Sequence, residues 1–260
     1  MTEPRNMVDL HCHILSGMDD GARTFDDSLA MAEMAIADGI THIVATPHAS
    51  NEYRFDFAAV CKATAELQRA IGDRLKLASG CDFHLCAENV AALKRNPSLF
   101  CIHQKDYLLV EFNEFSIPPS MDQAIYEIQL AGLRIIITHP ERNGILRTHQ
   151  ERLEQWIRTG AYGQVTAGAL TGSFGAQAKL MAFSWIARGL VHFVASDAHN
   201  LTGRPHKLRP AYDVVRAEFG PETAEALFVS NPLAAFEGRP LPHVPEITPE
   251  QTKKKRFIFF

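Results

Sequence analysis

The sequence predicts an α/β protein, a single domain built as a distorted barrel of seven β/α units resembling the TIM type. Short apolar runs alternate with amphipathic segments from residue 7 to about residue 230. Runs such as Ile135-Ile136-Ile137 are continuously apolar, which is typical of parallel strands buried on both faces. Between these segments, no composition break marks a linker. A barrel one unit short of (β/α)₈ explains this pattern most economically, and an open doubly wound sheet is the alternative.

Seven segments are expected to be strands because each is short, apolar and bounded by turn residues or by an expected helix. In chain order they cover residues 7–14, 40–46, 75–79, 107–110, 133–137, 161–166 and 191–195.

The expected helices follow the spacing of apolar residues and the capping signals. The first lies between Thr24, which forms a capping box with Asp27, and Gly39, which ends it. The others are expected at residues 57–71, 88–94, 121–131, 151–158, 176–188, 211–219 and 222–229.

The composition is that of an ordinary globular protein. Hydrophobic residues make up 46% and charged residues 22% of the 260 residues, and the net charge of −4 gives no reason to expect nucleic-acid binding. Five irregularly spaced cysteines favour reduced thiols and a cytoplasmic location over a disulfide framework. We expect neither a signal peptide nor a transmembrane segment, because no apolar run is long enough.

The two ends of the chain differ from its centre. We expect an N-terminal arm at residues 1–6, a catalytic domain at 7–238 and a C-terminal tail at 239–260. The tail is rich in proline and ends in Lys253-Lys254-Lys255-Arg256 followed by four apolar residues. This pattern fits either a docking segment or a solvated end, and we favour the solvated end.

Metal-binding residue types follow six of the seven expected strands. Alternation in the first strand places His11 and His13 on one face and Cys12 on the other. An isolated His-x-His is more often incidental than a ligand pair. However, the carboxyl ends of parallel strands share one face, so the six strand ends together predict a polynuclear metal site. The later residues are His48, Asp82, Glu111, His139, Asp197 and His199.

The residue types restrict the metal and the reaction. Imidazoles and carboxylates without thiolate suit Mn²⁺, Fe²⁺ or Zn²⁺ rather than a soft metal, and so many donors imply two or three ions. Such ions activate a shared water and clamp a phosphate, which is phosphoester-hydrolysis chemistry. Arg142 and Arg204 follow two of the strand ends and can bind phosphate oxygens, although either could instead pair with a surface acid. The P-loop, the C-x₅-R loop, G-x-S-x-G and H-E-x-x-H are all absent from the sequence.

Together these motifs resemble the polymerase-and-histidinol-phosphatase (PHP) superfamily. They are most similar to its bacterial manganese-dependent protein-tyrosine phosphatases of capsule and exopolysaccharide operons, the CpsB/YwqE type. The resemblance extends from about Met7 to Gly238. It rests on five ordered motifs: Asp9-Leu10-His11-Cys12-His13, Asp19-Asp20-Gly21, Ala45-Thr46-Pro47-His48, His139-Pro140-Glu141-Arg142 and Ala195-Ser196-Asp197-Ala198-His199.

The resemblance implies a trinuclear site on a distorted barrel. Arg142 and Arg204 would bind the phosphate. Spacing alone does not choose between Asp19 and Asp20, and the resemblance favours Asp20. The bridging acid of this branch is usually Glu, whereas this chain has Asp82, which is one methylene shorter. The three sets would be His11, His13, Asp82 and Asp197; Asp82, Glu111 and His139; and Asp20, His48 and His199.

The function expected from these residues and this resemblance is phosphotyrosine hydrolysis. A metal-activated hydroxide would attack phosphorus in line, and a phenolate would leave without a dedicated general acid. By resemblance, the substrate is the phosphotyrosine-rich tail of a bacterial tyrosine autokinase that controls polysaccharide synthesis. The alternatives are a small-molecule phosphatase acting on a compound such as histidinol phosphate, and a metal-binding domain without catalysis. The oligomeric state stays open.

Overall fold

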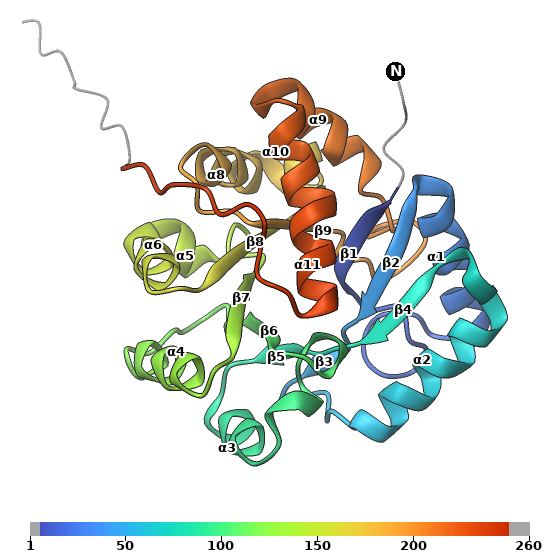
Figure 1. Cartoon of the computed structure of the whole chain (residues 1–260). Helices are drawn as coiled ribbons and strands as arrows, with labels where there is room; N and C mark the ends of the chain where they lie inside the picture. The colour runs from blue at the N-terminus through green and yellow to red at the C-terminus, as the bar shows by residue number, and fades with distance from the viewer. Residues whose placement is uncertain (1–5, 250–260) are drawn as a thin grey trace, which may run out of the picture.

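A computed structural model describes residues 6–249, and all its strand pairs are parallel (Figure 1). One sheet has three strands in the order β1 (Met7–Cys12), β2 (Ile40–Ala45) and β4 (Lys76–Ser79). The other has six, in the order β3 (His48–Ala49), β5 (Asp82–His84), β6 (Tyr107–Glu111), β7 (Arg134–Thr138), β8 (Tyr162–Thr166) and β9 (Phe193–Ala195). The predicted parallel α/β class is confirmed.

The two sheets meet where two of the expected strands are interrupted. Thr46 and Pro47 separate β2 from β3, and Gly80 and Cys81 separate β4 from β5. The amide of Asp82 donates to the carbonyl of Pro47 (3.1 Å), so the chain stays paired across the break. The expected second and third strands therefore each consist of two pieces, one in each sheet.

The sheets also meet at their other edges, where β1 lies beside the end of β9. The amide of Asp197 donates to the carbonyl of His11 (2.9 Å), and that of His13 donates to Ala198 (2.8 Å). Cys12 and Ala198 form an isolated parallel bridge. Within residues 6–249, regular ladders form two sheets rather than one closed barrel, and these contacts join their edges.

The helices lie around the strands, as Figure 1 shows. Thr24 caps α1 through the predicted capping box with Asp27. Helices α5, α7 and α11 were not predicted, since they are short and have too few turns for a clear apolar period. No helix in the described part of the chain is long and apolar enough to span a membrane. The α-helices are α1 (Phe25–Asp38), α2 (Phe57–Ile71), α3 (Ala87–Arg95), α4 (Ser120–Leu130), α5 (Gly144–Thr148), α6 (Gln150–Arg158), α7 (Ala167–Thr171), α8 (Gly175–Ala187), α9 (Arg209–Phe219), α10 (Pro221–Glu225) and α11 (Asn231–Glu237), with a π-helical turn at Ala226–Ser230.

Apolar side chains form two separate cores. The larger core fills the space between the strands and the surrounding helices. The smaller one joins residues from β1, β2, β4, β6, β7 and β9 to Ala235 and Phe236 of α11. Helix α11 therefore covers this inner core (Figure 1).

The start of the expected C-terminal tail packs on the domain. Tyr107 donates its hydroxyl to the carbonyl of Arg239 (2.8 Å), and the amide of Thr248 donates to Arg188 (3.0 Å). The basic and apolar run at residues 253–260 lies outside the described residues, as does most of the expected arm at 1–6.

Candidate metal centre

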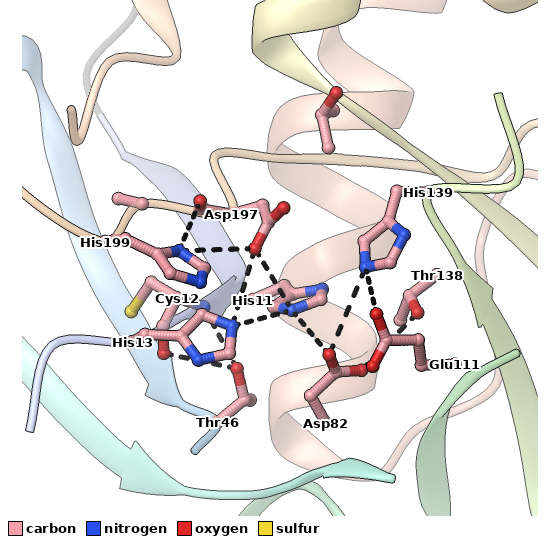
Figure 2. A network of polar contacts seen from close by, with 12 residues as sticks. His11, Cys12, His13, Thr46, Asp82, Glu111, Thr138, His139, Asp197 and His199 are labelled. Carbon is pink, nitrogen blue, oxygen red and sulfur yellow. Dashed lines mark hydrogen bonds and ion pairs between the residues drawn. The ribbon is translucent and has the colours of Figure 1, made fainter. Parts of the chain in front are cut away.

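The two histidines of the first motif face each other at the carboxyl end of β1. Their Nε2 atoms are 3.3 Å apart, and both side chains are buried (Figure 2). Cys12 lies between them in sequence, but its Sγ donates to the carbonyl of Val44. The alternation predicted for this strand end is confirmed, because the two imidazoles share one direction and the thiol takes another.

Two buried carboxylates approach these imidazoles from distant strands. The Nε2 of His11 lies 3.5 Å from a carboxylate oxygen of Asp82, at the start of β5, and 3.5 Å from one of Asp197, which follows β9. The Nε2 of His13 lies 3.4 Å from the same oxygen of Asp197. These four residues form the inner part of the cluster.

The remaining predicted ligands lie closer to the surface. Asp20 Oδ1 is 3.5 Å from His48 Nε2 and 3.4 Å from His199 Nε2. Glu111 Oε1 is 3.6 Å from His139 Nε2, and its Oε2 is 3.5 Å from His48 Nδ1. These five residues form the outer part of the cluster.

All nine predicted ligands therefore converge on one site. The donor set is nitrogen and oxygen, and it fits Mn²⁺, Fe²⁺ or Zn²⁺. Asp82 Oδ2, His48 Nδ1 and His199 Nε2 are buried without a hydrogen-bond partner, as expected for atoms that face a shared cation. The donors form four overlapping groups, each compact enough for one ion: His13, Asp20, His48 and His199; His11, His13 and Asp82; His11, His139 and Asp197; and His48, Asp82 and Glu111.

Three of the imidazoles are oriented through their Nδ1 atoms. His13 Nδ1 is 2.6 Å from Asp19, and His199 Nδ1 donates to the carbonyl of Asp197 at 3.0 Å. His11 Nδ1 is 3.3 Å from the side-chain amide of Gln164. In each ring Nε2 faces the cluster, and in His13 and His199 the Nδ1 atom meets an acceptor oxygen, which is the arrangement of histidines that bind a metal through one nitrogen.

The structure separates the roles of the two adjacent aspartates. Asp20 faces His48 and His199, whereas Asp19 binds the ring of His13 and accepts the backbone N–H of His48 (3.0 Å) and Gly21 (3.0 Å). A Cβ at Gly21 would lie 2.1 Å from the carbonyl oxygen of His13, so only glycine permits this loop to fold so closely. The geometry places Asp20 among the donors and Asp19 behind them.

Both predicted arginines converge on one carboxylate of the cluster. Arg142 Nη1 and Arg204 Nη2 each donate to Oδ2 of Asp197, while Oδ1 faces the histidines. The Arg142 guanidinium also stacks on the ring of Phe174, with its central carbon 4.5 Å from the ring centroid. Each arginine side chain remains about a quarter exposed, so an anion can reach it.

The site is strongly polarised. Burial raises the pKa of Asp82 and Asp197, but the neighbouring imidazoles, His11 foremost, outweigh burial and hold both pKa values well below the usual range. Burial and the charge of Asp82 raise the pKa of Glu111. Burial lowers the pKa of His13, but Asp19 and Asp197 together raise it to about 10. Concentrated negative charge around the imidazoles makes the cluster attractive to cations.

Two of the predicted ligands have an unusual backbone. His139 has φ of 32° and Asp197 has φ of 52°, although neither is glycine. Left-handed backbone at a non-glycine residue costs free energy and is common at functional sites. These turns redirect the chain just beyond β7 and β9 and point both side chains at the cluster.

Some supporting residues were not predicted individually. Asp9 accepts hydrogen bonds from the amide (2.9 Å) and the hydroxyl of Ser196, next to Asp197. Glu141 accepts from the amide of Thr166 at 2.8 Å and joins the ends of β7 and β8. Asp9 and Glu141 stand inside the quoted motifs, but nothing in the spacing of a motif reveals a partner from a distant strand.

Comparisons with known proteins agree with this arrangement. The family model described as "Capsular polysaccharide synthesis, CpsB/CapC" matches residues 7–237. The tyrosine-protein phosphatase YwqE of Bacillus subtilis (strain 168) is 37% identical over 220 residues, covering 83% of this chain and 86% of YwqE.

Solved structures give the same result for the fold. One chain from the crystal structures of YwqE from Bacillus subtilis and CpsB from Streptococcus pneumoniae, described as metal-dependent tyrosine phosphatases, matches with a TM-score of 0.87. It is 34% identical, and the match covers 94% of this chain and all of that one. Histidinol phosphate phosphatase from Lactococcus lactis matches with a TM-score of 0.55 at 14% identity, over 85% of this chain and 94% of that one, which shows a shared fold alone.

Proposed function

The chain belongs to the CpsB/CapC family of capsular polysaccharide synthesis proteins, and from this premise we propose that it is a metal-dependent tyrosine-protein phosphatase. One observation carries the proposal: nine nitrogen and oxygen donors converge at the strand ends, and two guanidinium groups meet Asp197 at the border of this cluster. A cation site beside two arginines suits a phosphate monoester.

Two or three ions would occupy the cluster: the family resemblance favours Mn²⁺, with Fe²⁺ or Zn²⁺ as alternatives. The spatial groups overlap the sets implied by the family resemblance without matching them. One group joins His139 to His11 and Asp197, and another joins His48 to Asp82 and Glu111. When bound, these ions lower the pKa of a water and neutralise phosphate charge. By the family resemblance, His11, His13, Asp82 and Asp197 would hold one; Asp82, Glu111 and His139 a second; and Asp20, His48 and His199 a third.

Arg142 and Arg204 would bind the phosphate oxygens. Both already hold a carboxylate oxygen of Asp197, which demonstrates that their donors can converge on one anionic oxygen. Phe174 supports the plane of Arg142 and limits its rotation. The arginines would thereby orient the phosphoryl group and neutralise charge that develops on it during transfer.

The proposed substrate is the phosphotyrosine-rich tail of a bacterial tyrosine autokinase that regulates capsular or exopolysaccharide synthesis. Phenolate is a good leaving group, so no dedicated general acid is required. We place the enzyme in the cytoplasm, where its five free cysteines would stay reduced.

We also propose that the two sheets are the wall of a distorted (β/α)₇ barrel of the PHP type. Parallel pairing, the contacts between β1 and Ala198, and the inner core beneath α11 support this interpretation. Residues 7–238 would form the phosphatase domain, with an arm at 1–6 and a tail at 239–260.

Hydrolysis assays test the function. The Mn²⁺-loaded protein should release phosphate from an aryl phosphate and from a phosphotyrosine peptide, but far more slowly from the same peptide carrying phosphoserine. R142A and R204A should raise KM while two or three ions per chain remain bound, as measured by elemental analysis. An absence of turnover on both aryl substrates at full metal occupancy would refute the proposal. Faster turnover of histidinol phosphate than of the peptide would favour the small-molecule alternative.

A further inference from the structure

The largest cavity beside the metal cluster is lined by neither of the two arginines. It has a volume of about 520 Å³, which is within the size range of small-ligand sites. Its wall includes Asp20, His48 and Glu111 of the outer cluster. A group bound in this cavity would therefore be in direct reach of the reacting centre.

Two aromatic residues stand at this cavity. Tyr53 stacks on His48, with ring centroids 5.8 Å apart and planes inclined by 18°. Phe115 follows β6 and is 91% exposed, more than any other large apolar side chain among the described residues. An apolar ring kept in water at the mouth of a catalytic cavity indicates a binding role.

Hydrogen bonds hold both aromatic residues on ordered turns. Asn113 Oδ1 accepts the amide of Phe115 at 2.8 Å, and the carbonyl of Asn113 accepts the side chain of Asn143 at 3.1 Å. The hydroxyl of Ser50 accepts the amide of Tyr53 at 3.1 Å. The backbone of each turn is thus restrained before any ligand arrives, which reduces the entropy lost on binding.

The cavity is also acidic beyond the predicted ligands. Glu52 and Glu114 line it, and neither a lysine nor an arginine does so in the described part of the chain. A smaller pocket of about 270 Å³ at Arg204 has the opposite character, since Arg204 and Lys207 line it and no carboxylate does. The two cavities therefore attract opposite charges.

We propose that Tyr53 and Phe115 receive the aromatic ring of the substrate, and that Glu52 and Glu114 select peptides with basic residues next to the phosphotyrosine. This inference rests on the proposed phosphatase function and identifies the substrate class of the same site. When Arg142 and Arg204 hold the phosphate, the tyrosine ring of the substrate extends from the cluster into the acidic cavity. The flanking peptide then passes between Glu52 and Glu114.

Binding separates this inference from the proposed function. The affinity of the Mn²⁺-loaded full chain is measured by calorimetry for two peptides that carry a non-hydrolysable phosphonate analogue of phosphotyrosine. They are identical except that lysines or glutamates flank the analogue. We expect the lysine peptide to bind about 4- to 25-fold more tightly, because it gains two charge contacts with the exposed carboxylates.

Two variants test the two parts of the site. F115A should weaken binding of both peptides about 5- to 20-fold without changing the metal content. E52K/E114K should reverse the preference in favour of the glutamate peptide. The matched controls are L180A, at an exposed position on α8, and K207E, in the smaller pocket at Arg204. Both controls should retain the wild-type preference.

The inference is wrong if F115A binds both phosphonate peptides within twofold of the wild-type affinity. It is also wrong if E52K/E114K still prefers the lysine peptide. A reversed preference in K207E would place the peptide in the smaller pocket at Arg204 and would also overturn it. If the wild type and variants bind as expected but no phosphotyrosine peptide is hydrolysed, the proposed function fails while the binding site stands.

Discussion

The inner and outer parts of the cluster differ in how the protein holds them. The side chains of His11, His13, Asp82 and Asp197 are at most 1% exposed and come from strand ends that hydrogen-bond to one another. In the outer part, Asp20 is 47% exposed and lies on the loop between β1 and α1. The inner residues are thus part of the folded core, whereas Asp20 can be changed with little effect on folding.

Removing an inner carboxylate should have the largest effect. In D197A both arginines lose their shared partner and His11 and His13 lose a counter-charge, so activity should fall by at least about 10³-fold. Because removing one partner of a buried ion pair costs about 3 kcal/mol, the Tm of the chelated protein should drop by roughly 6–12 °C. Hydrolysis of an aryl phosphate and calorimetric melting measure these changes.

D197N is the matched control, because amide and carboxylate have nearly the same shape. It should lose activity to a similar degree while melting closer to the wild type. Activity within tenfold of the wild type in D197A would contradict the importance of the inner part.

Substitutions of the adjacent residues Asp19 and Asp20 compare, within one loop, a residue that supports the fold with one that only faces the metal cluster. D20A should lose one bound ion and about 10²-fold in kcat/KM, with little change in the Tm of the chelated protein. D19A should weaken metal binding about 10- to 100-fold and also lower that Tm, since two backbone N–H groups lose their acceptor. Metal titration and melting of both variants distinguish these outcomes, and equal loss of Tm would show that Asp20 is structural too.

The smallest effect on activity at neutral pH should come from a histidine outside the cluster. Burial, followed by the charge of His243, lowers the pKa of His192 to about 4 from an ordinary value of 6.5. Between pH 6.5 and pH 4 the unfolded chain binds the extra proton, so folding stability must fall as the pH falls through this window. The loss reaches about 3 kcal/mol at pH 4 and levels off just below that pH.

H192Q isolates this contribution, because glutamine can still accept the amide of Gly163, which His192 accepts at 3.2 Å. Urea unfolding of the chelated protein at pH 7 and pH 4.5 should show a smaller stability loss in H192Q than in the wild type. Parallel pH profiles for the two proteins would assign the acid sensitivity to the cluster instead.

Much of the fold and site was predictable because its signals are local. The capping box of Thr24 and Asp27 set the start of α1, and strand alternation separated Cys12 from the two histidines. The breaks after Ala45 and Ser79 were not predictable, because a continuous apolar run does not reveal where its strand changes partner.

The sequence by itself determined the alternation of parallel strands with helices and the position of metal-binding residue types at strand ends, where eight of the nine proposed ligands lie. It did not choose between Asp19 and Asp20. Only the tertiary structure decided how the ligands combine. In the folded chain, Asp197 lies beside His11, 186 residues away in sequence, and both arginines donate to Oδ2 of Asp197. Asp20 faces the cluster, whereas Asp19 lies behind it. Periodicity and capping act within a few residues, whereas these contacts depend on which strand ends become neighbours and on how tightly each loop folds back. The sequence therefore reveals which side chains can bind a metal, and the packing of the strands brings these side chains into one site.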